Sequence, residues 1–99
     1  MPKLEIVVTP AAEADMHSIF DFIAQDNISK ANQILNIFEE KFDMISDFPQ
    51  CGISYAKVLK RDARCLVVAK HYQIFYKEKN GIIYILRILT GYQDINNLL

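Results

Sequence analysis

The chain has 99 residues, of which 52% are hydrophobic and 23% charged, and only three are Gly and three Pro. This length fits one domain, residues 1–99, and the composition is too apolar for a disordered chain and too varied for a fibre. Apolar runs such as residues 82–86 are far shorter than the roughly 20 residues that span a bilayer. Because Glu5 stands where a signal peptide would begin its apolar core, we expect a cytoplasmic protein without a membrane partner.

The net charge of −1 conceals two halves of opposite sign. Residues 1–56 carry three bases against nine acids, net −6, whereas residues 57–99 carry eight bases against three acids, net +5. Such asymmetry indicates either an anionic partner, which could be a nucleic acid or an acidic peptide, or an internal dipole. The charge pattern alone leaves both interpretations open.

Cysteine and histidine side chains give little evidence of chemistry. Cys51 and Cys65 are too few for a disulfide framework and lack metal-ligand spacing, so reduced thiols, no metal and no cofactor are expected. His17 and Asp21, four residues apart, supply only half a metal site, and a plain surface pair is favoured. Cys51 or Cys65 could act as a nucleophile with His71 as its general base, but neither cysteine lies in a local context that would activate its thiol.

Residues 4–8 predict a short strand, and Thr9-Pro10 then provides an N-cap and a first helical residue. A helix is expected over about 10–25. Its predicted buried face comprises Ala12, Met16, Ile19, Phe20 and Ile23. Its predicted solvent face carries Asp15, Ser18 and Asp21.

A second helix is expected over about 29–47, with Ser29 as its N-cap and Phe48-Pro49 ending it. Its predicted buried stripe comprises Ala31, Ile34, Leu35, Phe38, Phe42 and Ile45. The two helices would form a hairpin, followed by a loop at 49–52, a short strand at 55–59 and a turn at 60–62.

From Arg64 the pattern changes to strands, at 64–70, 72–78 and 81–89, and Asn80-Gly81 predicts a hairpin turn. Strict alternation in the last strand would place Ile83, Ile85, Arg87 and Leu89 on one face and Ile82, Tyr84, Leu86, Ile88 and Thr90 on the other. Both faces would be apolar, so one should receive the helical hairpin, and the other should meet a partner or stay exposed. The fold class predicted is α+β.

Basic and aromatic side chains gather in the C-terminal half: Arg61, Arg64, Lys70, His71, Tyr72, Tyr76, Lys77, Arg87 and Tyr92. They suit either a solvated sheet face or recognition of RNA or protein. Arg87 interrupts an apolar strand, where an unpaired charge would be costly. We therefore expect an internal acidic partner for Arg87, and favour a structural role over a functional one.

Several short motifs accompany this order of elements: residues 9–15 (TPAAEAD), 20–23 (FDFI), Phe48-Pro49 with Gly52, 71–76 (HYQIFY) and 87–94 (RILTGYQD). Together, the order and the motifs resemble the RelE/ParE superfamily of type II toxins. The resemblance covers nearly the whole chain. It implies an N-terminal strand, a helical hairpin and then an antiparallel sheet of three to four strands.

The ribonuclease branch of that superfamily, which resembles RelE, needs a local acid, a base and phosphate-clamping arginines. This sequence has Gln73, Thr90 and Gln93 where such relatives often carry Arg, His and Arg, which favours the ParE branch. That resemblance implies a toxin that inhibits DNA gyrase without being an enzyme. A ribosome-dependent mRNA endoribonuclease, or a non-toxic binding module that retains the fold, is the alternative.

The resemblance also implies a partner, a small ParD-like or other antitoxin, which would form a hetero-oligomer with the toxin and be its only link to DNA. No catalytic residue is assigned. Candidates for contacting the antitoxin or the target are Arg61, Arg64, Lys70, Tyr76, Arg87, Tyr92 and Asp94. The apolar end at Leu98-Leu99 suggests that the tail contributes to toxicity, although docking on the chain's own core would explain it equally.

Overall fold

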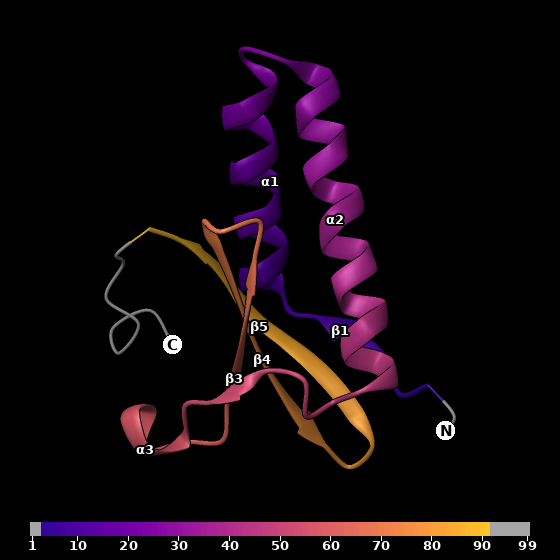
Figure 1. Ribbon diagram of the computed structural model, residues 1–99, viewed down its shortest axis with the longest axis vertical. Helices are drawn as coiled ribbons and strands as arrows, with labels where there is room; N and C mark the ends of the chain where they lie inside the picture. Colours follow the sequence, from indigo (N-terminus) through magenta and orange to yellow (C-terminus); the bar gives the residue numbers. More distant parts are fainter. Residues whose placement is uncertain (1–2, 92–99) are drawn as a thin grey trace.

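The computed structural model describes residues 3–91, apart from the side chains of residues 58 and 59. A hairpin of two long helices stands beside a twisted sheet, and a short helix lies at the far side of that sheet (Figure 1). The elements in chain order are β1 (Glu5–Val8), α1 (Pro10–Ala24), α2 (Ile28–Asp47), β2 (Ile53–Ser54), α3 (Ala56–Leu59), β3 (Arg64–Val68), β4 (Tyr72–Lys79) and β5 (Ile82–Thr90).

The sheet has the strand order β1-β5-β4-β3-β2. Strands β2 to β5 pair antiparallel, as the predicted meander requires, but β1 joins β5 in parallel, so the sheet is mixed and five-stranded. The α+β class and the antiparallel sheet of four C-terminal strands are confirmed, and the parallel pairing of β1 enlarges that sheet to five strands. The predicted strand at 55–59 is wrong, because β2 ends at Ser54 and α3 follows it.

Both long helices begin with a side-chain cap. Thr9 Oγ1 accepts from the Ala12 N–H at 3.3 Å, which confirms the predicted cap of α1. In α2 the cap is Asn27, whose Oδ1 accepts from the Lys30 N–H at 3.1 Å, and the predicted cap Ser29 lies within the first turn. Asn27 rather than Ser29 is the N-cap because its backbone is extended and its side-chain oxygen reaches the third N–H of the helix.

The main core lies between the helical hairpin and one face of the sheet. Phe38 and Ile45 of α2 are fully buried there, as the α2 stripe predicts, and Phe38 meets Tyr72 edge to face at 5.4 Å. On α1 only Ala12 and Ile19 of the predicted face are buried, and Met16, Phe20 and Ile23 are half-buried. Helix α1 therefore lies against β5, while α2 contributes more of the buried side chains, and part of the apolar surface of α1 stays accessible.

Strand β5 contains a bulge that reverses the predicted alternation of its side chains. Phe75 pairs with Arg87, but the next residue, Tyr76, pairs with Ile85, so Leu86 has no direct partner across the ladder. As a result Ile83, Ile85 and Ile88 all enter the main core, whereas Leu89 joins the opposite face. One extra residue flips every side chain that follows it, and a strict period of two cannot show this.

The second face of the sheet carries a smaller cluster of Cys65, Phe75 and Leu89. Tyr55 covers it, with its ring edge to face on Phe75 at 5.4 Å, so the chain itself supplies much of the cover expected from a partner. Val67 nevertheless stays 58% exposed. Within the described residues, no helix is both long and apolar enough to cross a membrane.

Candidate functional site

The loop between α2 and β2 is held by the buried side chain of Tyr76. Its hydroxyl donates to the Pro49 carbonyl and accepts from the Gly52 N–H, each at 2.8 Å. A methyl group at Gly52 would lie only 2.7 Å from this hydroxyl, so glycine is required for the close approach. Burial is the main cause that raises the pKa of Tyr76 to about 12, which keeps the phenol neutral and able to donate.

Arg64 at the start of β3 adds a third tie to the same loop, since its Nη1 donates to the Gly52 carbonyl at 2.8 Å. Two residues predicted as contact candidates, Arg64 and Tyr76, thus meet at Gly52. Tyr76 is fully buried and presents no surface to a partner in this conformation, whereas Arg64 is half-buried and reaches the protein surface.

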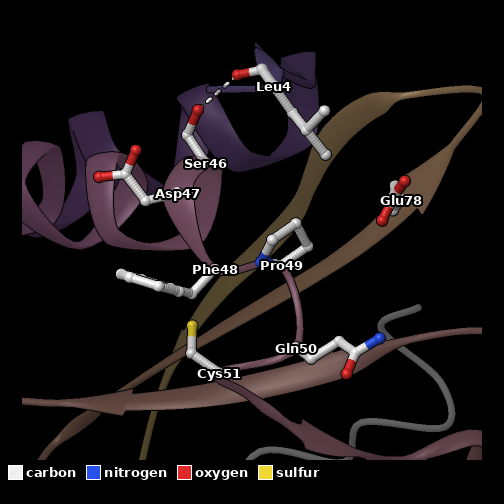
Figure 2. A pocket seen from close by; sticks show the side chains of 8 residues that line it. All are labelled: Leu4, Ser46, Asp47, Phe48, Pro49, Gln50, Cys51 and Glu78. Carbon is white, nitrogen blue, oxygen red and sulfur yellow. Dashed lines mark hydrogen bonds between the residues drawn. The ribbon is translucent and has the colours of Figure 1, made fainter. Parts of the chain in front are cut away.

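A pocket of about 650 Å³ opens beside this loop (Figure 2). Its walls come from the entry to β1, the end of α2, the loop itself and the end of β4, and they comprise Leu4, Ser46, Asp47, Phe48, Pro49, Gln50, Cys51 and Glu78. Ser46 Oγ donates to the Leu4 carbonyl, and Lys3 pairs with Asp47 at 3.0 Å. Phe48 is 66% exposed, so the described chain leaves most of a large apolar residue at this edge uncovered.

A smaller pocket of about 210 Å³ adjoins the first and shares Pro49, Gln50 and Glu78 with it. Its other walls are charged: Asp62, Arg64 and Lys77. We call the two together the loop groove, which runs from an apolar end at Phe48 to a mixed, cation-bearing end at Arg64 and Lys77. Such a groove can bury an apolar side chain and pair a carboxylate.

The other predicted contact residues are dispersed. Arg61 is exposed in the segment before β3, and Lys70 is exposed in the β3–β4 turn, where its φ of 67° lies in the left-handed region. These two lie beyond opposite ends of β3, so the structure does not bring them into one site. Tyr92 and Asp94 lie outside the described residues.

Arg87 has an internal acidic partner, as predicted, and that partner is Asp15 of α1. Its Nε donates to Asp15 Oδ2 at 2.7 Å and its Nη2 to Asp15 Oδ1 at 2.8 Å, a geometry that raises the pKa of Arg87. The Ile88 N–H, beside the bulge, also donates to Asp15 Oδ2 at 2.9 Å. The carboxylate thus satisfies a backbone group at the bulge as well as the guanidinium.

The prediction that Asp15 faces solvent is therefore wrong: its side chain is 15% exposed. A signal was present in the sequence, because Asp15 stands three residues after Ala12 and four before Ile19, both on the buried face. Arg87 in an apolar strand and an acid on an apolar helix face are each costly alone, and pairing them removes both costs.

The two thiols differ in environment. Cys51 is exposed in the loop groove, with Sγ 3.7 Å from the Tyr76 hydroxyl. Cys65 is buried on the second face, and burial raises its pKa to about 11, so it stays protonated at neutral pH. Residues 3–91 hold no group of three or more His, Cys, Asp or Glu side chains placed to bind a metal.

An N-terminal strand, a helical hairpin and a meander that ends beside the first strand define a RelE/ParE-type α+β fold. The sequence matches the family described as the ParE toxin of type II toxin-antitoxin system, parDE, over residues 6–95. The chain therefore belongs to the ParE toxin family.

Among solved structures, a chain of the chromosomal ParDE TA system from P. aeruginosa is similar, with a TM-score of 0.75 and 20% sequence identity. The match covers 91% of this chain and 98% of that one, so the two share the fold along nearly their whole length. No curated protein matches the sequence significantly.

Proposed function

We propose that this chain is the toxin of a type II toxin-antitoxin pair, that it acts in the cytoplasm by inhibiting DNA gyrase, and that a small antitoxin neutralises it. The observation that carries the proposal is membership of the ParE toxin family over residues 6–95. Gyrase is named as the target because the ParE branch resembles gyrase poisons rather than nucleases.

The arrangement of the late strands supports inhibition by binding rather than by RNA cleavage. Arg87, the cation nearest the end of β5, is held by Asp15 in a bidentate pair and is not available as a phosphate clamp in this conformation. Gln73 and Thr90 cannot transfer a proton near neutral pH. A ribonuclease would lose its main sources of acceleration without a base and a cation at these positions.

The test of the target compares two reactions with purified chain. Inhibited supercoiling or trapped cleavage by gyrase is expected, with no cut in mRNA on ribosomes by toeprinting. Cleaved mRNA with unaffected gyrase would overturn the assignment and favour the ribonuclease alternative. Inactivity in both assays, with antitoxin binding retained, would favour the non-toxic module.

We place the antitoxin in the loop groove. Its apolar end lies beside Phe48, and its other end sets the cations Arg64 and Lys77 among Asp62 and Glu78. This lining suits an amphipathic segment that folds on binding and places its carboxylates opposite the two cations. An interface of this kind should bury more than about 1,000 Å² and extend beyond the groove. The exposed Val67, outside the groove, offers apolar surface to such an extension.

A matched pair of exposed phenylalanines tests this placement. Phe48→Asp should weaken antitoxin affinity at least about tenfold, because an anchor side chain in an apolar pocket is lost and a like charge faces the acidic segment. Phe22→Asp, at a similarly exposed position on α1, should leave antitoxin affinity within about twofold of the unchanged chain. Equal effects of the two changes, measured by calorimetry, would remove the loop groove from the interface.

The tail is proposed to contact the target rather than the antitoxin, although residues 92–99 lie outside the described residues. Deleting residues 92–99 should relieve toxicity in induced cells and leave antitoxin affinity largely unchanged. Loss of antitoxin binding in the deletion variant would assign the tail to the other interface.

A further inference from the structure

A second groove runs along the helical hairpin and shares no residue with the loop groove. It has a volume of about 400 Å³ and lies between α1 and α2, lined by Glu13, Met16, His17, Phe20, Asp21 and Leu35. We call it the hairpin groove. Met16, Phe20 and Leu35 are half-buried, so an apolar surface is open to solvent between the helices.

The rim of the hairpin groove is acidic. Glu13 and Asp21 are exposed on α1 two turns apart, and Glu39 stands one turn after Leu35 on the same side of α2. No Lys or Arg is among the lining residues, all of which the structure describes. Lys30 and Lys41, five and six residues from Leu35, point about 140° and 120° away around the helix axis.

We propose that the hairpin groove binds a basic, amphipathic peptide segment of a partner protein, which inserts an apolar side chain between Met16, Phe20 and Leu35 and pairs Lys or Arg with Glu13 and Asp21. Charge complementarity decides the class of occupant. The rim repels nucleic acid and acidic peptides, and the loop groove with Arg64 and Lys77 is the surface that suits an acidic segment.

A second copy of this chain fits less well. Its basic half, net +5, could reach the acidic groove only through a head-to-tail contact. Such a contact joins two different surfaces and generates open filaments unless its rotation closes a ring. The proposal therefore commits to a different protein, and predicts that the acidic antitoxin and the basic segment can occupy the chain together.

The experiment uses the full chain, labelled for amide NMR, and a helical peptide with leucines on one face and lysines on the other. A second peptide carries glutamate in place of every lysine. The lysine peptide should shift amides of α1 and α2 around the hairpin groove, and the glutamate peptide should not. Binding should weaken as salt rises, because exposed charge pairs are screened.

Glu13→Gln with Asp21→Asn removes two rim charges without changing side-chain size, and should weaken the lysine peptide roughly three- to tenfold. Glu40→Gln with Asp26→Asn removes two exposed charges that do not line the groove, and should change affinity less than twofold. Equal weakening by both pairs, no binding, or shifts confined to the loop groove would overturn the proposal. Self-association of the chain that Glu13→Gln with Asp21→Asn abolishes would assign the groove to a second copy instead.

Discussion

The two faces of the sheet are covered in different ways. On one face the hairpin of α1 and α2 seals a continuous core in which Phe38 and Ile45 are fully buried. On the other, Tyr55 covers a small cluster around Phe75, and Val67 remains exposed. The first face is closed by long amphipathic helices, and the second by a short segment whose cover depends largely on one aromatic ring.

This difference bears on where the chain could recognise partners. A face sealed by helices contributes stability and offers little surface, and the two proposed recognition sites, the loop groove and the hairpin groove, lie at its margins. The second face is covered by few contacts, so we expect its local unfolding to need less free energy than unfolding of the main core. Four predictions test this contrast, from the largest expected effect to the smallest.

Truncating one aromatic ring on each face compares the two directly. Phe38→Ala should lower the free energy of unfolding by about 3–5 kcal/mol, because it leaves a cavity in the main core. Tyr55→Ala should lower it by about 1–2 kcal/mol, because a half-buried ring and one edge-to-face contact are lost. Urea titrations measure both, and similar losses would contradict the unequal contribution of the faces.

The ion pair of Asp15 and Arg87 joins α1 to β5 at the bulge. This bulge determines which face of the sheet the later side chains of β5 occupy. Asp15→Asn should lower the free energy of unfolding by about 2–3 kcal/mol, because it leaves the Arg87 side chain, which is only 21% exposed, without its charge partner. Asp21→Asn on the same helix, at an exposed position, should stay within about 0.5 kcal/mol. A thermal melt that does not distinguish the two changes would show that the pair adds no stability.

Gly52 packs against a residue from each cluster, Tyr76 of the main core and Cys65 of the second face. A methyl group added at Gly52 would lie 2.7 Å from the Tyr76 hydroxyl and 3.0 Å from the Cys65 carbonyl oxygen. Gly52→Ala should cost about 2 kcal/mol, since buried atoms must move. Gly81→Ala provides the control: its φ is +78° with nothing near the added methyl, so only backbone strain of about 1 kcal/mol is expected. Chemical denaturation of both variants measures the difference.

The buried thiol of Cys65 gives the second face a pH dependence. Burial raises the folded pKa from 9.0 to about 11, so the unfolded chain loses this proton first and stability falls as pH rises through that window. Cys65→Ala should flatten the decline in unfolding free energy over this range. At pH 8 a disulfide reagent should label Cys51 rapidly and Cys65 only after denaturation, and rapid labelling of both would contradict the burial.

Sequence patterns predicted part of the candidate site. An Arg in an apolar strand is so costly that an internal partner could be expected for Arg87, and the structure confirms it. Asp15 was missed as that partner because a charged residue on an amphipathic helix was assigned to the solvent face. The loop groove was also missed, because its walls come from four segments distant in sequence and nothing local marks their meeting.

By itself the sequence determined the two helices, the β meander, the Asn80-Gly81 turn, where both φ angles are positive, and the family. These follow from hydrophobic periodicity, caps and turn residues, which act over a few neighbouring residues. Tertiary structure alone decided the parallel pairing of β1 with β5 and the bulge at Leu86. Both depend on which distant backbone groups become partners, and a strand's own residues do not specify that choice.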